Sequence, residues 1–356
     1  MEVKRLSASA VEVILAGKYR LFVGRCEESV SCHSILCHGV QDVINAIDRV
    51  QSQHAKLYAT LPVAHIALSA RPSAMITRCQ LGERIPLPFG WTVRAVSNGL
   101  EIGGASWLFD RCSQTVLVAC SMSMQPFLTI PAYIGKVDYL VTSLSDKTLG
   151  VADTFRTEMI DTVKEHSTAL IALPEWDISG LVLVLEFIMR NVSNGPVVVI
   201  GRIFDKLIKS AHSLYEWLND DRRIAVFDSL EEFPEFDGNI FAGWLSRNLI
   251  VATDPVTLSK PSRQPSVLIA AASLFDVSTN WLFANFTNIN VKTIDASSQR
   301  IQTTSADDIK KLFPESTITT GSAHIPRSVT RTVRVCTGST TKGILYCDLD
   351  GNPCLR

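Results

Sequence analysis

The stretch SILCHGVQDV, residues 34–43, decides how the chain around it folds. Its first four residues form a short, largely apolar run that is typical of a buried β-strand. From Ile44 onward the chain reads as an amphipathic helix. The apolar stripe of that helix, with i, i+3, i+4, i+7 spacing, consists of Val43, Ala46, Ile47 and Val50. We therefore expect a corner between a strand and a helix, with two polar side chains, His38 and Asp42, at the corner.

The sequence on both sides of this corner favours β-structure. Upstream, residues 11–16 and 19–23 alternate around a turn at Gly17-Lys18, which predicts a hairpin with one buried face. Downstream, apolar or alternating segments bounded by turn residues predict strands at 56–62, 91–96, 103–109, 115–120 and 137–142. The first half of the chain is therefore expected to be rich in β-strands.

The rest of the chain alternates between helical and strand patterns. Helices are predicted near 154–166, 178–190, 205–218 and 306–313. Strands are predicted at 169–173, 196–200, 266–270, 291–294 and 317–320. Strands that alternate with helices indicate a parallel sheet with crossover connections. A final hairpin is predicted to pair 333–335 with 344–346.

Composition limits the class of protein. The 356 residues suffice for two ordinary domains or one domain with a large insertion, and 46% hydrophobic against 19% charged residues indicates a packed globular chain. A net charge of −1 argues against a strongly basic nucleic-acid surface, although a local patch can lie within a neutral total. The longest apolar run, 181–189, contains Glu186 and is too short to span a bilayer, so we expect no membrane association. The nine cysteines are scattered without a Cys-x-x-Cys pair, so we expect an intracellular protein with reduced thiols.

Three further motifs accompany the corner. They are LYATLPV at 57–63, IGGASW at 102–107 and SAHSLYEWL at 210–218. In this order and spacing, and over roughly Val11 to Thr320, the chain resembles the metallo-β-lactamase/β-CASP proteins of RNA 3′-end processing. The resemblance implies an α/β fold, namely an αββα sandwich with an inserted β-CASP α/β domain. The expected boundaries are 1–176 for the first part, 177–283 for the insert, 284–330 for the return segment and 331–356 for a tail.

Active members of that family hold two metals with a His-x-His-x-Asp-His box at such a corner. Here His38 and Asp42 remain, but Val40 and Val43 replace the other two histidines. Four other expected ligand positions carry Gly24, Leu100, Ser121 and the neutral Thr142, and no histidine is present where two later ones are expected, near 295–297 and at about Thr320. Two-metal phosphodiester cleavage needs ligands that hold two cations about 3.5–4 Å apart, and the remaining donors are too few for even one tetrahedral zinc. We therefore expect no catalytic, cofactor-binding or metal-binding residues.

The resemblance points to the inactive branch of the family, whose members belong to the Integrator and the cleavage and polyadenylation complexes. It implies a nuclear, non-catalytic subunit that pairs with an active homologous endonuclease, together with other subunits and an indirect contact to RNA. The chain ends soon after the return segment. It is therefore expected to lack most of the C-terminal region through which such subunits pair.

Other interpretations stay open. Cys32-His33 and Cys37-His38 place four zinc donors close together, but the spacing is not that of a zinc finger, so a structural role is favoured. A hydrolase with a metal site rebuilt from His33, His38, Asp42 and cysteines is the main alternative function. A free-standing interaction module unrelated to RNA is a third. His38 and Asp42 themselves either form a bracing hydrogen-bonded pair or are two solvated residues of a loop.

Overall fold

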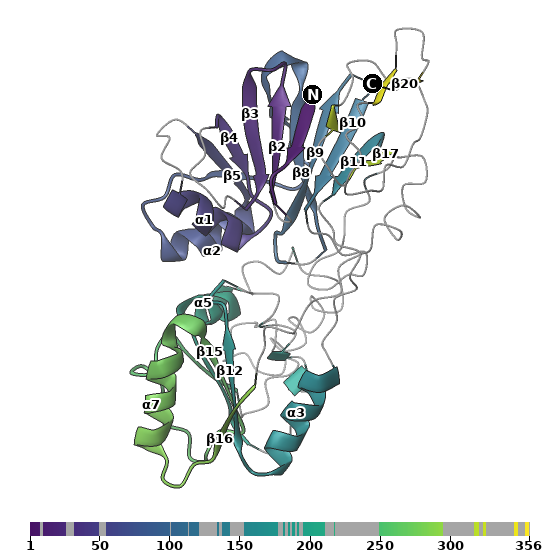
Figure 1. Ribbon diagram of the computed structural model, residues 1–356. Coiled ribbons are helices and arrows are strands. Elements are labelled where there is room, and N and C mark those ends of the chain that lie inside the picture. Colours follow the sequence, from purple (N-terminus) through teal and green to yellow (C-terminus); the bar gives the residue numbers. More distant parts are fainter. Residues whose placement is uncertain are drawn as a thin grey trace, which may run out of the picture. The chain divides into compact units, whose positions relative to one another are not determined.

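In a computed structural model, the chain is a mixed α/β protein with several β-sheets. The residues described are 1–7, 10–25, 32–49, 55–99, 101–112, 114–120, 134, 137–142, 153–176, 181, 184–185, 187–188, 191, 195–210, 217, 249–294, 317–319, 323–324, 345–347 and 353–355. The chain forms two compact units (Figure 1). Unit 1 comprises Met1–Thr148 and Thr303–Arg356, and unit 2 comprises Leu149–Gln302. Unit 2 is thus a continuous insertion within unit 1.

Unit 1 contains a seven-stranded sheet in the order β18-β1-β2-β3-β4-β5-β6. Its strands are β1 (Glu2–Arg5), β2 (Ala10–Leu15), β3 (Tyr19–Gly24), β4 (Ser34–Leu36), β5 (Lys56–Thr60), β6 (Thr77–Cys79) and β18 (Ala323–His324). The predicted hairpin is confirmed as β2 and β3, but its single buried face is not, because all six residues of β2 are buried. In its turn Ala16 and Gly17 have positive φ values of 52° and 67°, as in the type I′ turns that suit the twist of a hairpin.

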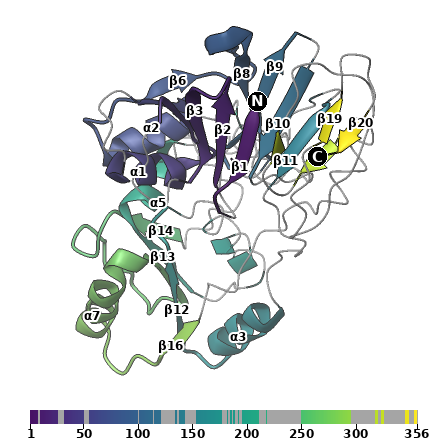
Figure 2. The same ribbon diagram turned by 45° about the horizontal axis from the view of Figure 1, so that its top comes forward.

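Two helices accompany this sheet, α1 (Val40–Arg49) and α2 (Leu61–Ala70), and they lie side by side near β4 and β5 (Figures 1 and 2). The sequence patterns predict α1 but not α2. Pro62 ends the predicted strand, yet it occupies the first turn of a helix, where its missing N–H has no helical partner to lose.

The second sheet of unit 1 has the order β17-β11-β10-β9-β8-β7. Its strands are β7 (Ile85–Pro86), β8 (Thr92–Ser97), β9 (Ala105–Arg111), β10 (Gln114–Ala119), β11 (Tyr139–Thr142) and β17 (Thr317–Thr319). A short 3₁₀ helix, η1 (Pro88–Gly90), connects β7 to β8. The return of the chain after unit 2 adds one strand to each sheet, β17 beside β11 and β18 beside β1.

The two sheets share one core. Val13 and Val23 of the first sheet and Trp107 and Val116 of the second belong to the same buried cluster. Side chains one position along these strands point the other way, so Leu117 packs in a separate cluster. This alternation is the pattern of a β-sandwich.

Unit 2 is built around a parallel sheet of the order β14-β13-β15-β12-β16. Its strands are β12 (Thr168–Leu173), β13 (Val197–Ile200), β14 (Leu249–Ala252), β15 (Val267–Ala271) and β16 (Val291–Ile294). The helices include α3 (Asp153–Lys164), α5 (Arg202–Ser210), α7 (Phe275–Asn285) and the 3₁₀ turn η5 (Ala272–Leu274). Helices α3 and α7 lie on opposite sides of the sheet (Figures 1 and 2). The central strands are buried on both faces, as expected for a covered parallel sheet.

Several expected boundaries differ from the observed ones. The expected boundaries place 169–173 in the first domain and 291–294 in the return segment, but β12 and β16 pair with each other inside unit 2. The predicted tail hairpin is also different, because β19 (Leu345–Cys347) pairs with β20 (Pro353–Leu355). The predicted helix at 306–313 lies outside the described residues, and the one at 178–190 lies partly outside them. Among the helices described, none is long and apolar enough to cross a membrane.

Candidate functional site

The strand-to-helix corner places His38 and Asp42 together, but through the backbone. Helix α1 begins at Val40, earlier than predicted, so Asp42 lies in its first turn. The backbone N–H of His38 donates to Oδ2 of Asp42 at 3.0 Å. His38 is only 4% exposed, which excludes the interpretation of two solvated loop residues. The carboxylate therefore fixes the chain as it turns into the helix.

The imidazole of His38 is held by β9. Its Nδ1 lies 2.5 Å from the carbonyl oxygen of Ala105, and the N–H of Ala105 donates to the His38 carbonyl at 2.8 Å. An N–H on Nδ1 satisfies the first contact, which leaves Nε2 as the nitrogen that is not bonded to the backbone. The ring is thus fixed between the two sheets of unit 1.

Cys120, directly after β10, is the second chemical group of the site. Burial by itself lowers the pKa of His38, but the Cys120 sulfur, and to a lesser extent Asp42 and the Ala105 carbonyl, outweigh burial and raise the pKa to about 9. The Cys120 thiol is itself buried. A thiol beside an imidazole is the arrangement that lets a sulfur transfer its proton to nitrogen.

Arg25 and Glu101 are two further charged residues beside the corner. Burial raises the pKa of the Asp42 carboxyl, while His38 and the Arg25 guanidinium oppose this effect. The carboxylate of Glu101 lies directly against Gly39, so that a β-carbon on Gly39 would collide with it. The site therefore combines His38 and Asp42 of the corner with Arg25, Glu101 and Cys120 from other segments of unit 1.

The positions expected to lack metal ligands fall into two groups. Gly24 ends β3, and Val40 and Val43 of α1 are fully buried in the apolar interior. The remaining positions, or their side chains, lie outside the described residues: Leu100, Ser121, Thr142, 295–297 and Thr320. Within the part of the chain that the structure describes, no group of three or more His, Cys, Asp or Glu side chains is arranged to hold a metal ion.

The cysteine–histidine cluster at 32–38 is divided between different partners. His33 accepts a hydrogen bond from the N–H of Arg20 at 3.2 Å, and its ring stacks on Tyr19 with a centroid distance of 4.7 Å. Burial raises the pKa of the Cys32 thiol to about 11. His38 is instead held at Ala105. The structural interpretation of this cluster is therefore favoured over a zinc site.

Three of the four sequence motifs meet at this corner. The hydroxyl of Thr60, in LYATLPV, donates to the carbonyl of Gly103, in IGGASW, at 2.5 Å. The indole N–H of Trp107 donates to the carbonyl of Cys37 at 3.1 Å. Most of the fourth motif, 210–218, lies outside the described residues.

Sequence reasoning missed Glu101 and Cys120 as members of the site. Each is adjacent to a position that the resemblance singled out, Leu100 and Ser121. A shift of one residue in each motif would have identified them. The signal was thus present, since both are ionisable residues at the end of a strand or turn.

Compared with known families and with curated proteins, the sequence matches no family model and no curated protein.

Proposed function

We propose that this chain is a non-catalytic subunit of the metallo-β-lactamase/β-CASP type, which scaffolds an RNA 3′-end-processing complex by pairing with an active homologous endonuclease. A sandwich of two sheets interrupted by a parallel-sheet insertion supports this proposal. A nuclear location and membership of an Integrator-like complex go with it.

The observation that carries the proposal is the environment of Val40 and Val43. Both positions would hold metal ligands in an active relative, and both are 0% exposed. Their side chains form part of the buried face of α1. A buried valine contributes to stability through packing and offers no lone pair to a cation. The corner therefore serves the fold where an active enzyme would bind metal.

Metal analysis and an RNA-cleavage assay on the purified chain test the absence of catalysis. We expect less than one equivalent of bound zinc or manganese and no cleavage of single-stranded RNA with either metal added. Metal-dependent cleavage that is lost in His38→Ala but kept in His65→Ala, a histidine elsewhere in unit 1, would refute the proposal.

Affinity purification from native cells with quantitative mass spectrometry tests the pairing. An active metallo-β-lactamase/β-CASP endonuclease should be enriched in a fixed ratio to the chain. If no such nuclease is enriched while other proteins are, the chain is instead an interaction module unrelated to RNA processing.

The alternative function is a metal-dependent hydrolase with a rebuilt site. The observation that favours it is the gathering of His38, Asp42, Glu101 and Cys120 around one corner. The arrangement of the described residues, which offers no three-ligand group, counts against it. One tightly bound metal per chain, lost in Cys120→Ser, would establish this alternative.

A further inference from the structure

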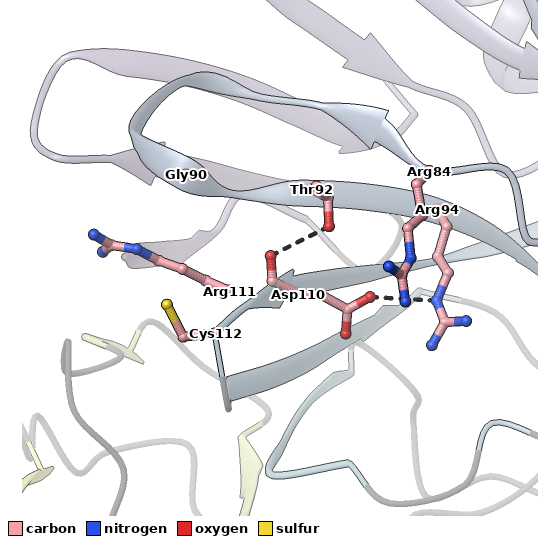
Figure 3. A pocket seen from close by; sticks show the side chains of 7 residues that line it. All are labelled: Arg84, Gly90, Thr92, Arg94, Asp110, Arg111 and Cys112. Carbon is pink, nitrogen blue, oxygen red and sulfur yellow. Dashed lines mark hydrogen bonds and ion pairs between the residues drawn. The ribbon is translucent and has the colours of Figure 1, made fainter.

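At the other end of strands β8 and β9 from the His38 corner, unit 1 has an open pocket of about 270 Å³ (Figure 3). It is lined by Arg84, Gly90, Thr92, Arg94, Asp110, Arg111 and Cys112. Of these seven residues, three carry guanidinium groups and one carries a carboxylate. A chain with a net charge of −1 therefore carries a local positive site.

The guanidinium groups of this pocket differ in whether a carboxylate already pairs with them. Nε of Arg94 lies 3.3 Å from Oδ2 of Asp110, so these two charges offset each other. The guanidinium of Arg111 lies over the ring of Trp91, 5.8 Å from its centroid, and Arg84 is exposed. The carboxylate of Glu83, next to Arg84, accepts the N–H of Gln80 at 2.8 Å. Among the described residues, Arg84 and Arg111 form no ion pair, so theirs are the guanidinium groups of the pocket that an external anion can contact.

The arrangement of the guanidinium groups favours an extended polyanion. Figure 3 shows Arg84 and Arg94 together at one end of the pocket, whereas Arg111 points away toward the other end. A single phosphate contacts one end only. A strand with successive phosphates contacts both ends.

An exposed aromatic residue, Phe89, directly precedes Gly90, which lines the pocket. Phe89 is 45% exposed and has a φ of 63°, a left-handed conformation that is uncommon for a residue with a side chain. A large part of this apolar side chain is therefore accessible to solvent. Aromatic rings beside a basic groove are the platforms on which bases of single-stranded nucleic acids stack.

We infer that this pocket binds single-stranded RNA, with Arg84 and Arg111 contacting successive phosphates and Phe89 stacking on a base. The inference concerns direct RNA contact by this chain, and it is independent of the pairing with an endonuclease proposed above. It also assigns a use to a surface remote from the corner of His38.

Fluorescence-anisotropy titration of the full chain with a short labelled oligouridylate tests the inference. We expect a dissociation constant in the range of about 10⁻⁴–10⁻⁶ M, weakening with salt. The double variant Arg84→Gln/Arg111→Gln should bind at least about tenfold more weakly, and its salt slope should fall by about 1.4, which is the loss of two phosphate contacts on a single strand. Phe89→Ala should lower the affinity by about fivefold or more without changing the slope.

A matched double variant controls for total charge. Lys18→Gln/Arg78→Gln removes the same charge from exposed positions of unit 1 outside the pocket, and it should bind like the wild type. Because Arg111 packs over Trp91, its loss can weaken the fold as well as remove a charge. The variant Arg111→Lys separates the two effects, because it keeps the charge and should therefore preserve the salt slope. Circular dichroism verifies folding of every variant.

The native thiol of Cys112 gives an independent readout. It is exposed and lines the pocket, so bound oligouridylate should slow its modification by a thiol reagent. The inference is overturned if the charge control loses affinity as much as the pocket variant. It is also overturned if Phe89→Ala has no effect on binding and heparin, a polyanion without bases, binds as tightly as RNA. A third contrary result is that a phosphopeptide protects Cys112 from the thiol reagent and RNA does not.

Discussion

Trp107 of the second sheet donates its indole N–H to the carbonyl of Cys37, which follows β4 of the first sheet, at 3.1 Å. The side chain is fully buried within the core that both sheets share. One residue thus contributes both apolar contact and a hydrogen bond to the contact between the two sheets.

Trp107→Phe should lower the free energy of unfolding by about 1–3 kcal/mol, because it removes the donor for a buried carbonyl while keeping an aromatic ring. Trp107→Ala should cost about 3–5 kcal/mol, since it also leaves a cavity. Urea denaturation followed by circular dichroism measures both values. Trp281→Phe, in the half-buried setting of α7, is the control and should have the smaller effect.

Gly103→Ala should destabilise the protein by about 2–5 kcal/mol. Gly103 has a φ of 73°, and a β-carbon there would lie 2.7 Å from Cβ of Pro62 and 2.8 Å from Oγ1 of Thr60. Gly17→Ala is the matched control, because its φ of 67° is similar but no atom lies within 4 Å of an added β-carbon. It should cost only the backbone term of about 1–2 kcal/mol. Equal losses in the two variants would contradict the packing argument.

Arg20→Met should cost about 2–4 kcal/mol of unfolding free energy. The carboxylate of Glu12 is 5% exposed, and its Oε1 lies 2.5 Å from both Nε and Nη2 of Arg20, across the β2–β3 hairpin. Removing the guanidinium leaves a buried charge without its partner. Glu12→Gln combined with Arg20→Met should recover part of the loss.

A solvated ion pair provides the comparison for Arg20. Lys4 and Glu2 lie 3.5 Å apart with exposed side chains, so Lys4→Met should change the stability by no more than about 0.5 kcal/mol. A loss as large as that of Arg20→Met would show that burial of Glu12 is not the cause.

The contribution of His38 to stability should depend on pH. Its pKa in the folded chain is raised to about 9 from 6.5, so the imidazolium form is favoured by folding. The contribution is complete below about pH 6.5 and is lost as the pH rises through about 9. We expect the stability difference between the wild type and His38→Asn to fall by up to about 3 kcal/mol over that range. Urea titrations at a series of pH values measure it.

The neighbours of His38 predict which of two substitutions lowers its pKa more. Cys120→Ala should lower the pKa of His38 more than Asp42→Asn does, because the sulfur is the larger of the two raising effects. NMR of the imidazole protons reports the pKa directly. The reverse order would assign the raised pKa to the carboxylate.

The described cysteines should differ sharply in reactivity. Burial raises the pKa of Cys32 to about 11 and, with a smaller effect of Glu83, that of Cys79 to about 12. Cys112 is exposed. At pH 8, iodoacetamide should therefore modify Cys112 rapidly and spare Cys32 and Cys79 until urea unfolds the chain. Peptide mass spectrometry identifies the modified sites, and early labelling of Cys79 would contradict its buried position.

Apolar segments bounded by turn residues predicted most of the strands, although the alternation read in residues 11–16 did not predict that both faces of β2 are buried. The hairpin of β2 and β3 and the buried strands β4, β13 and β15 follow directly from their apolar residues. Helix α2 was missed because its residues 61–70 are apolar nearly all round and begin with Leu61-Pro62, which reads as the end of a strand. Local pattern cannot separate a helix that is apolar on nearly every side from a strand of similar composition.

The site depends on contacts that local pattern does not contain. Ala105 contacts His38 although 67 positions separate the two residues in sequence. Cys120, which follows β10, also interacts with His38. The early start of α1 moved Asp42 from a loop into a helical turn, where its carboxylate bonds to the backbone. The expected domain boundaries are wrong for the same reason, because only the pairing of β12 with β16 shows that both strands belong to unit 2.

The strands contributed by the returning chain determine the order in which the molecule can be completed during synthesis. Unit 2 is continuous, so its parallel sheet can form as soon as residues 149–302 have emerged. The sheets of unit 1 cannot be finished then, because β1 and β11 wait for β18 and β17, which are made more than 170 residues after β11. Until that point both strands present unpaired edges, the feature that exposes a nascent chain to aggregation. One edge of β1 thus pairs early with β2, whereas its other edge is among the last to acquire its native partner.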